Sequence, residues 1–184
     1  LSFGKTGVVG SSSGRDSMSL LRALLLPAAV AAQGYYAENS GGYSNYAYGS
    51  WSTVGGGGLN TVYYPYATVS GGWQNYVYSY ASNIVGGASN TQYATYGTIG
   101  GGTANDCYSD WSTVGGGYAN LAIAYEGVIA GGTSNTVYYA SDCSVGGGDS
   151  NVVYDYNFAA VNGGVSNFAY GYASFIGGGA LNSI

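Results

Sequence analysis

Apolar residues return at fixed intervals along most of this chain. From Asn45 onward the interval is fifteen residues, and an Asn starts each unit. Counting that Asn as position 1, position 10 carries a β-branched residue in the fifteen-residue units: Val54, Val69, Ile84, Ile99, Val114, Ile129 and Ile176. In the two sixteen-residue units the extra residue displaces it by one, to Val145 and Val161. Position 3 is mostly small and apolar: Ala47, Val62, Val77, Cys107, Ala122, Val137, Val153 and Ala169, with Gln92 as the exception. Such positions are typical of strand residues that face a core and stack on themselves.

The repeat extends to polar and glycine positions. The Asn recurs at 45, 60, 75, 90, 105, 120, 135, 151, 167 and 182, so two intervals have sixteen residues. A Gly pair lies in the second half of each interval, from Gly56-Gly57 to Gly178-Gly179. A unit of this length is too short for two helices and indicates one coil of a solenoid. The sequence predicts an all-β fold, a parallel β-solenoid or β-roll of about nine coils of 15–16 residues.

Position 4 predicts an outward aromatic row, because side chains alternate between the two faces of a strand. It holds a tyrosine in eight of nine units: Tyr48, Tyr63, Tyr78, Tyr93, Tyr108, Tyr138, Tyr154 and Tyr170. Ile123 interrupts the row. Rungs about 4.8 Å apart allow offset contacts between neighbouring rings. The row is expected to stabilise the stack, to form a recognition face, or both.

A second outward surface is predicted at positions 7 and 9. Position 8 between them is small: Ser52, Ala67, Ser82, Gly97, Ser112 and Gly127. Alternation then turns positions 8 and 10 inward and positions 7 and 9 outward. The side chains of this predicted face are Trp51, Thr53, Tyr66, Thr68, Tyr96, Thr98, Trp111 and Thr113. The pattern decays in later units.

The Gly pairs and the Asn are expected in the turns, where positive φ and side-chain hydrogen bonds to the backbone are needed. An Asn in every unit also suggests an amide ladder along the axis. The glycines recur without a following helix or Lys, so they are not a phosphate-binding loop.

Charge excludes several classes of function. The three cationic side chains are Lys5, Arg15 and Arg22, and no Lys, Arg or His follows them. Nucleic acid is therefore excluded as a partner, since phosphate binding needs cations. Without His, without Lys in the repeats and without a paired-acid spacing, we expect no enzyme, no cofactor and no metal site.

The two cysteines are expected to be unpaired within the chain. Cys107 occupies inward position 3, and Cys143 follows two units later. Two rungs correspond to about 9.6 Å, beyond the usual Cα separation of a disulfide. Cys107 is expected to be buried. Cys143 is a candidate for exposure and pairing between chains.

The N-terminal segment differs in composition. Residues 18–32 combine one positive charge, a short apolar run and small residues, which is typical of a secretory signal; the alternative is a helix that caps the solenoid. The expected organisation is an upstream or disordered segment 1–17, this segment 18–32, a linker 33–40 and the repeat domain 41–184. The apolar run is too short to span a membrane. We expect secretion, to the extracellular space or the cell surface.

The repeats resemble a known family. Asn60-Thr-Val-Tyr-Tyr-Pro-Tyr-Ala-Thr-Val-Ser-Gly-Gly-Trp-Gln74 is similar to the head repeats of trimeric autotransporter adhesins, as are Ser112-Thr-Val-Gly-Gly-Gly117 and Ala173-Ser-Phe-Ile-Gly-Gly-Gly179. The resemblance implies a left-handed parallel β-roll, trimers and adhesion to surfaces. It covers residues 41–184. The Tyr at position 4 departs from the family pattern, which has a small residue there.

These observations favour a secreted or cell-surface structural or adhesive protein that binds or self-assembles through its aromatic and Thr rows. Expected partners are further copies of the chain, as a trimer or filament, and an extended surface such as matrix, polysaccharide or ice. The alternative function is ice binding through the Tyr or Thr ladder, and a carbohydrate-binding face is a third option.

Overall fold

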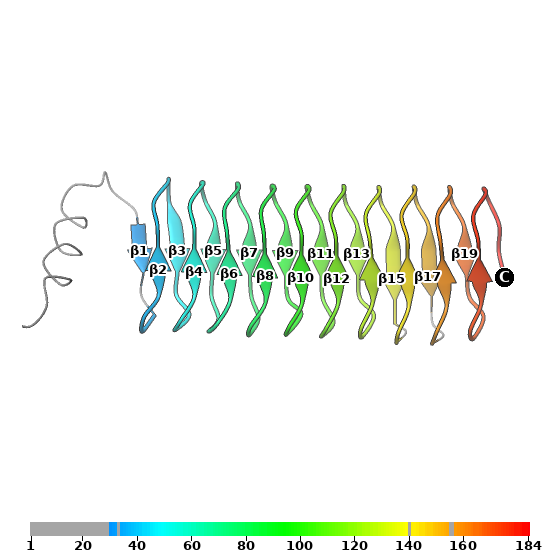
Figure 1. Cartoon of the computed structure of the whole chain (residues 1–184), viewed down its shortest axis with the longest axis horizontal. Helices are drawn as coiled ribbons and strands as arrows, with labels where there is room; N and C mark the ends of the chain where they lie inside the picture. The colour runs from blue at the N-terminus through cyan, green and yellow to red at the C-terminus, as the bar shows by residue number, and fades with distance from the viewer. Residues whose placement is uncertain (1–29, 33, 140, 155–156) are drawn as a thin grey trace, which may run out of the picture.

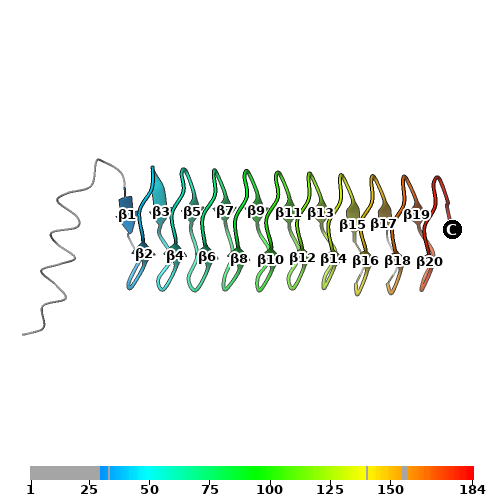
Figure 2. The same ribbon diagram turned by 45° about the horizontal axis from the view of Figure 1, so that its top comes forward.

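The computed structural model describes residues 30–32, 34–139, 141–154 and 157–184. These form a parallel β-solenoid of about nine turns, and no helix occurs among them. Figure 1 shows the turns in line along one axis, and Figure 2 shows the two sets of strands on opposite sides of the rod. The predicted fold class is confirmed.

Two ten-stranded sheets form the two sides, and every pairing within them is parallel. We call them sheet A and sheet B. Sheet A contains β1 (Val30–Ala32), β3 (Asn45–Ala47), β5 (Thr61–Val62), β7 (Tyr76–Val77), β9 (Thr91–Gln92), β11 (Asp106–Cys107), β13 (Leu121–Ala122), β15 (Thr136–Tyr138), β17 (Val152–Tyr154) and β19 (Phe168–Ala169). Sheet B contains β2 (Glu38–Asn39), β4 (Thr53–Val54), β6 (Thr68–Val69), β8 (Asn83–Ile84), β10 (Thr98–Ile99), β12 (Thr113–Val114), β14 (Val128–Ile129), β16 (Ser144–Val145), β18 (Ala160–Val161) and β20 (Phe175–Ile176).

The sheets begin earlier in the chain than residue 41. Strand β2 lies within the segment 33–40 that we expected to be a linker, and it pairs with β4. Strand β1, at the end of the segment 18–32, pairs with β3. The expected upstream segment 1–17 and the rest of the expected signal or capping helix lie outside the described residues.

The core is one layer of small side chains between the sheets. Position 10 from sheet B and position 3 from sheet A are buried throughout, as the alternation predicted. Position 8 adds buried small residues such as Ser52 and Ala67. Because successive strands pair residue for residue, each core side chain stacks on the same position of the next coil. A core this thin leaves no room for an aromatic ring, so the rings of the repeats lie outside.

A buried amide ladder runs along the corner between the sheets. Asn75 is typical: its backbone N–H and its side-chain Nδ2 both donate to Asn60 Oδ1, at 3.0 and 3.1 Å. The same Nδ2 donates to Gly71 O in the turn below and to Gly87 O in the coil above. The ladder continues to Asn182. The amide ladder that the sequence suggested is therefore present, and it supplies hydrogen-bond donors to the carbonyls of the glycine turns.

Candidate functional surfaces

The most regular exposed feature is the row of tyrosines at position 4, which we call the tyrosine ladder. It lies on the outer face of sheet A and consists of Tyr48, Tyr63, Tyr78, Tyr93, Tyr108, Tyr138, Tyr154 and Tyr170, the residues expected from the sequence. The centroids of the Tyr63 and Tyr78 rings are 4.7 Å apart with planes 10° apart. Tyr93 and Tyr108 are related in the same way, at 4.7 Å and 15°.

The ladder is interrupted at Ile123, as the sequence indicated. Below this residue the stack is continuous from Tyr48 to Tyr108. Above it, Tyr138 and Tyr154 stack at 5.1 Å, whereas Tyr154 and Tyr170 meet edge to face. The exposed array therefore has two sections.

Stacking decides which part of each ring meets the solvent. Nearly parallel rings whose centroids are about 5 Å apart are offset, and each covers part of its neighbour's face. Tyr63 and Tyr93 are each 41% exposed. Each of these rings exposes mainly its edge and its hydroxyl group to the solvent. Sugar stacking, which needs a free ring face, is disfavoured along the continuous section.

The phenols of the ladder affect one another's acidity. Burial raises the pKa of the Tyr78 phenol, and the charge and hydroxyl of Tyr63 raise it further. Burial and the nearby Asp106 carboxylate raise the pKa of Tyr108. A hydrogen bond to Tyr139 raises that of Tyr138. These phenols stay protonated at neutral pH and remain hydrogen-bond donors.

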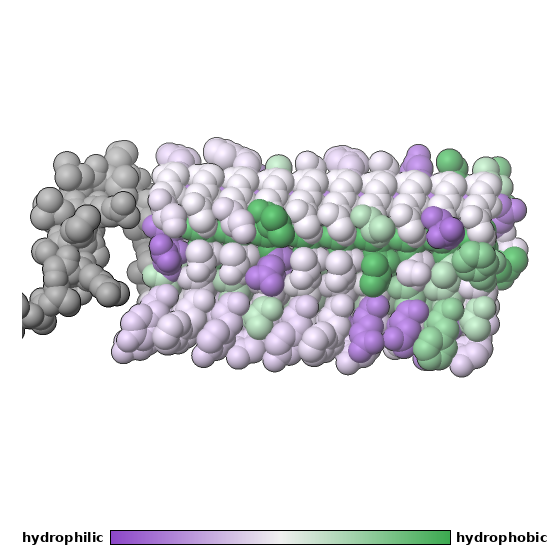
Figure 3. Space-filling view, in the orientation of Figure 1, coloured by the Kyte–Doolittle hydropathy of each residue, from purple (hydrophilic) through white to green (hydrophobic). Residues whose placement is uncertain are grey.

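The threonine row of the second predicted face lies on sheet B. Thr53 pairs with Thr68, and Thr98 pairs with Thr113, with Asn83 between the two pairs. These side chains point away from the core, since the residue after each of them is buried. Figure 3 shows this side of the rod, where most of the surface is near neutral in hydropathy. Beyond Thr113 the row continues as Val128 and Ser144.

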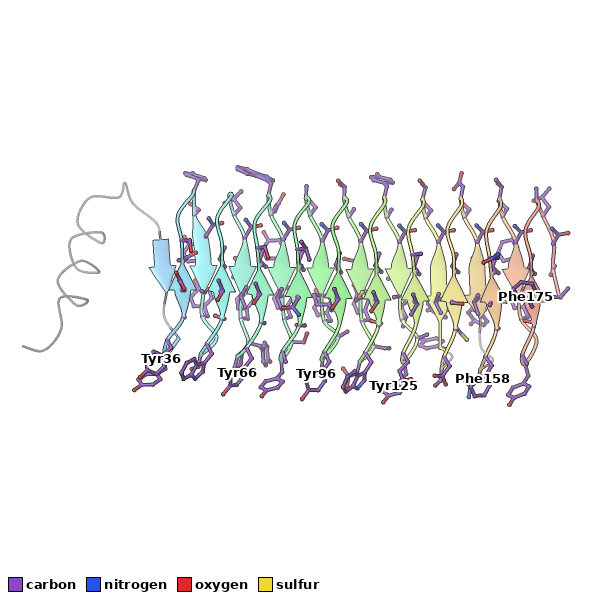
Figure 4. All side chains as sticks on the ribbon, viewed as in Figure 1. Tyr36, Tyr66, Tyr96, Tyr125, Phe158 and Phe175 are labelled. Carbon is purple, nitrogen blue, oxygen red and sulfur yellow. The ribbon has the colours of Figure 1, made fainter. Side chains whose placement is uncertain are left out.

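The aromatic residues at position 7 do not flank the threonines on the strand. Trp51, Tyr66, Tyr96 and Trp111 have φ values of 60°, 58°, 58° and 64°, so each lies in a turn in the left-handed conformation. The alternation that we extended back to position 7 stops at position 8. These rings project from the edge of the rod, where Figure 4 labels Tyr66 and Tyr96.

Together with residues at position 6, these rings form a second cluster that the sequence analysis missed. We call it the aromatic edge; its members are Tyr35, Tyr36, Trp51, Tyr66, Tyr80, Tyr96, Trp111, Tyr125, Phe158 and Tyr172. The Tyr36 and Trp51 centroids are 4.3 Å apart, and those of Tyr96 and Trp111 are 4.5 Å apart. The sequence predicted its four rings at position 7 but not the whole cluster, because the rings are divided between positions 6 and 7, with Phe158 displaced by the extra residue of its coil. Counting both positions together would have revealed it.

The acidic residues that the structure describes do not form a metal-binding site. Among the described residues no group of three or more His, Cys, Asp or Glu side chains is placed to hold a metal ion. Asp110 Oδ1 accepts a hydrogen bond from the backbone N–H of Thr95, at 2.8 Å, which is a turn contact. Burial raises the pKa of Asp106, against hydrogen bonds from Thr91 that lower it.

Both cysteines are buried, which rules out the exposed position that the sequence left open for Cys143. Cys107 is a free thiol inside the core, as predicted, and burial raises its pKa to about 12. Cys143 occupies inward position 8 because the extra residue of its coil lies before it, in the turn. Its Sγ lies 3.3 Å from Ser141 O. A disulfide between chains through this buried residue is therefore disfavoured.

The fold and its surfaces define the chain as a parallel β-solenoid with exposed tyrosine clusters. The chain matches no family model, and no curated protein is significantly similar to it in sequence. In the part of the chain that the structure describes, no helix is long and apolar enough to cross a membrane.

Proposed function

We propose that this protein is a secreted or cell-surface structural element that adheres to surfaces and to further copies of itself. The observation that carries the proposal is the pairing of two exposed aromatic arrays, the tyrosine ladder and the aromatic edge, on one rod. Large exposed aromatic residues are typical of interaction surfaces, where one part of the ring is apolar and the hydroxyl remains hydrated.

Repetition suits adhesion by many weak contacts. Each coil presents the same groups as its neighbour, so a partner with its own repeat meets several equivalent sites at once. The second contact then forms at a high effective concentration, and avidity exceeds the affinity of one contact. An extended matrix, a polysaccharide or another solenoid has such a repeat. The likeness of the repeat to adhesin head units supports the same role, including association into trimers.

The surface chemistry is consistent with self-association. The described repeats hold only acidic charged residues, and these are few. Strong charge repulsion between rods is therefore absent, and hydroxyl and amide groups supply most of the polar surface. The proposal includes no catalytic step.

Ice binding is the second candidate, and the threonine row supports it. Thr53, Thr68, Thr98 and Thr113 lie on a sheet whose rungs are in register. Flat sheets over many strands are unusual and are stabilised by stacking and by side-chain ladders. A regular, uncharged row on such a sheet suits ordered water. Its interruption at Asn83 and its end after Thr113 favour adhesion as the first choice.

The test compares adhesion and ice shaping in the same variants. Tyr93→Ala/Tyr108→Ala removes two stacked rings from the middle of the ladder. The matched control is Tyr43→Ala/Tyr118→Ala. It removes two exposed rings from the edge of the rod opposite the aromatic edge. We expect the ladder variant alone to lose retention on matrix-coated surfaces and to lose self-association in sedimentation velocity. Circular dichroism should show that both variants keep the sheet.

Ice-crystal shape and thermal hysteresis decide between the candidates. We expect the parent protein to leave ice growth unchanged. Shaped ice in the parent, lost on Thr98→Tyr but retained in the ladder variant, would establish the threonine row as an ice-binding face. Retention of surface adhesion by the ladder variant at the parent level would refute the adhesive role of the ladder.

A further inference from the structure

The continuous section of the tyrosine ladder holds phenols closer together than a surface of separate tyrosines does. Adjacent centroids from Tyr48 to Tyr108 lie 5.5, 4.7, 5.0 and 4.7 Å apart, with planes within 18° of parallel. The hydroxyl-bearing edges of these rings face the solvent. Each ring therefore has a phenol neighbour within contact distance and an edge open to a reagent.

We propose that the tyrosine ladder is a site of oxidative phenol coupling, in which a peroxide-dependent, one-electron oxidant joins tyrosines of neighbouring coils as dityrosine. Within the ladder, the pairs with the closest centroids are Tyr63–Tyr78 and Tyr93–Tyr108. This assigns a covalent modification to the ladder and does not rest on the adhesive function proposed above.

The reaction balances with hydrogen peroxide as the oxidant. Two phenols each lose one electron and the hydroxyl proton, which gives two phenoxyl radicals. Hydrogen peroxide takes up the two electrons and two protons, its O–O bond breaks, and two water molecules form. The radicals combine at ring carbons ortho to oxygen, which makes one C–C bond. The hydrogens on those carbons leave as protons and return to the oxygens, which restores both phenols.

Geometry favours the ladder over tyrosines that are more accessible but have no phenol at the same position of the adjoining coils. Tyr43 and Tyr118 are 63% and 56% exposed, more than any ladder residue. They lie at position 14, where their partners in the adjoining coils are Gly58, Thr103 and Thr133. A radical formed on either one has no phenol of an adjoining coil beside it. A radical on this section of the ladder has a phenol on at least one side, and the gain in encounter probability is that of an intramolecular reaction.

The expected product links neighbouring coils. Tyr63 and Tyr78 are fifteen residues apart in sequence and belong to adjacent strands, β5 and β7. A bond between them closes a short loop and restricts the unfolded chain, as a disulfide of that span does. Coupling should therefore raise the melting temperature of the rod.

The experiment treats the full chain, at low concentration, with a haem peroxidase and hydrogen peroxide. Dityrosine fluorescence reports the yield, and mass spectrometry of peptic peptides locates the links by the loss of two hydrogens. We expect intrachain links at 63–78 and 93–108 and a higher melting temperature after treatment. In denaturant the preference for these pairs should disappear, since it depends on the stacked geometry.

Two variants with equal numbers of tyrosines make the test specific. Tyr63→Phe/Tyr93→Phe keeps the stacked rings but leaves the remaining ladder phenols of this section, Tyr48, Tyr78 and Tyr108, without a ladder phenol in an adjoining coil. We expect a several-fold loss of intrachain dityrosine in this section. Tyr43→Phe/Tyr118→Phe should match the parent. Links concentrated at Tyr43 or Tyr118, an unchanged yield in the ladder variant, or the same link pattern in denaturant would each overturn the proposal.

Discussion

Each coil depends on a glycine that no other residue replaces without strain. The second glycine of each pair has a positive φ between 81° and 98° in the coils from Gly42 to Gly179. A Cβ on Gly87 would lie 2.0 Å from Gly102 O and 2.8 Å from Asn90 Nδ2. The backbone here approaches the next coil and the amide ladder too closely for a side chain. The first glycine has a different role, because a Cβ on Gly86 meets no atom within 4 Å.

The two glycines of one pair therefore predict opposite results. Gly87→Ala should destabilise the protein by roughly 2–4 kcal/mol, from the strained φ and the displaced carbonyl. Gly86→Ala should change the free energy of unfolding by less than about 1 kcal/mol. Urea denaturation followed by circular dichroism measures both. Equal losses in the two variants would show that the close approach to Gly102 is not what makes this glycine necessary.

The coil that contains Gln92 departs from the core pattern, and a second departure in the same coil compensates for it. Gln92 replaces the small residue at position 3 and is fully buried, and neither of its amide atoms has a hydrogen-bond partner. Its Nε2 occupies the space that a side chain at Gly97 would fill, since a Cβ there would lie 2.0 Å away. The large residue and the missing side chain fit each other across the core. Two orphaned polar atoms are the cost.

This pair predicts a coupled response to substitution. Gly97→Ser alone should be severely destabilising because it collides with Gln92, and Gln92→Val alone should leave a cavity. The double variant restores the pattern of the neighbouring coils and should be at least as stable as the parent. Thermal denaturation of the four proteins gives the coupling energy. Additive effects of the two substitutions would contradict the packing described.

At the scale of elements, short strands are held in register by continuous ladders. Most strands have two residues, too few to be stable alone, and each pairs with the strands above and below it. The buried amide ladder adds hydrogen bonds at the same place in every coil. The register of the strands is thus specified by the Asn, the second Gly and the core Val or Ile of each coil. The side chains on the outside do not set the register, which explains why they vary more freely.

The amide ladder requires an amide rather than a carboxylate. Asn90 Nδ2 donates to Asn75 Oδ1, Gly86 O and Gly102 O, at 3.0, 3.1 and 3.1 Å. Asn90→Asp would place an oxygen against these three oxygens inside the protein. We expect a loss of roughly 3–5 kcal/mol at neutral pH. The loss should shrink as the pH falls toward about 4 and stay small below it, because burial raises the pKa of the introduced carboxyl in the folded state and the group is protonated in both states below the unfolded value.

The matched control is Asn83→Asp, which makes the same change on the exposed face of β8. It should alter stability by no more than about 0.5 kcal/mol at any of these pH values. Chemical denaturation at neutral and acidic pH checks both variants. A large effect of Asn83→Asp would mean that added charge, and not the buried ladder, is responsible.

The sequence predicted the features that depend on period and alternation. The core positions, the outward direction of Tyr63 and its neighbours, and the interruption at Ile123 all follow from these two rules. The aromatic edge did not follow, because the left-handed conformation of residues such as Trp51 and Tyr66 ends the alternation in a turn. The sequence left the burial of Cys143 undecided, because the place of the extra residue within its coil is not visible in the sequence.

At the scale of the whole molecule, the rod carries few charges, and among the described residues the pKa values of four phenols and of both thiols are raised. Burial raises the pKa of Cys107 to about 12 and that of Cys143 in the same direction. The phenols of Tyr78, Tyr108 and Tyr138 are also shifted upward. All of these groups are neutral when protonated. The folded state therefore holds protons at alkaline pH that the unfolded chain releases.

This difference sets the direction of the alkaline response. A group whose folded pKa is higher than its unfolded value contributes stability that is present below the unfolded value and lost as the pH rises. For Cys107 the loss spans pH 9 to about 12. Thermal denaturation should show a melting temperature that falls through this window. Cys107→Val places at position 3 the residue that Val62 and Val77 supply in other coils, and it should reduce the fall without changing stability greatly at neutral pH. If the melting temperature falls equally in the parent and in Cys107→Val, the buried thiol is not the group that holds the extra proton of the folded state.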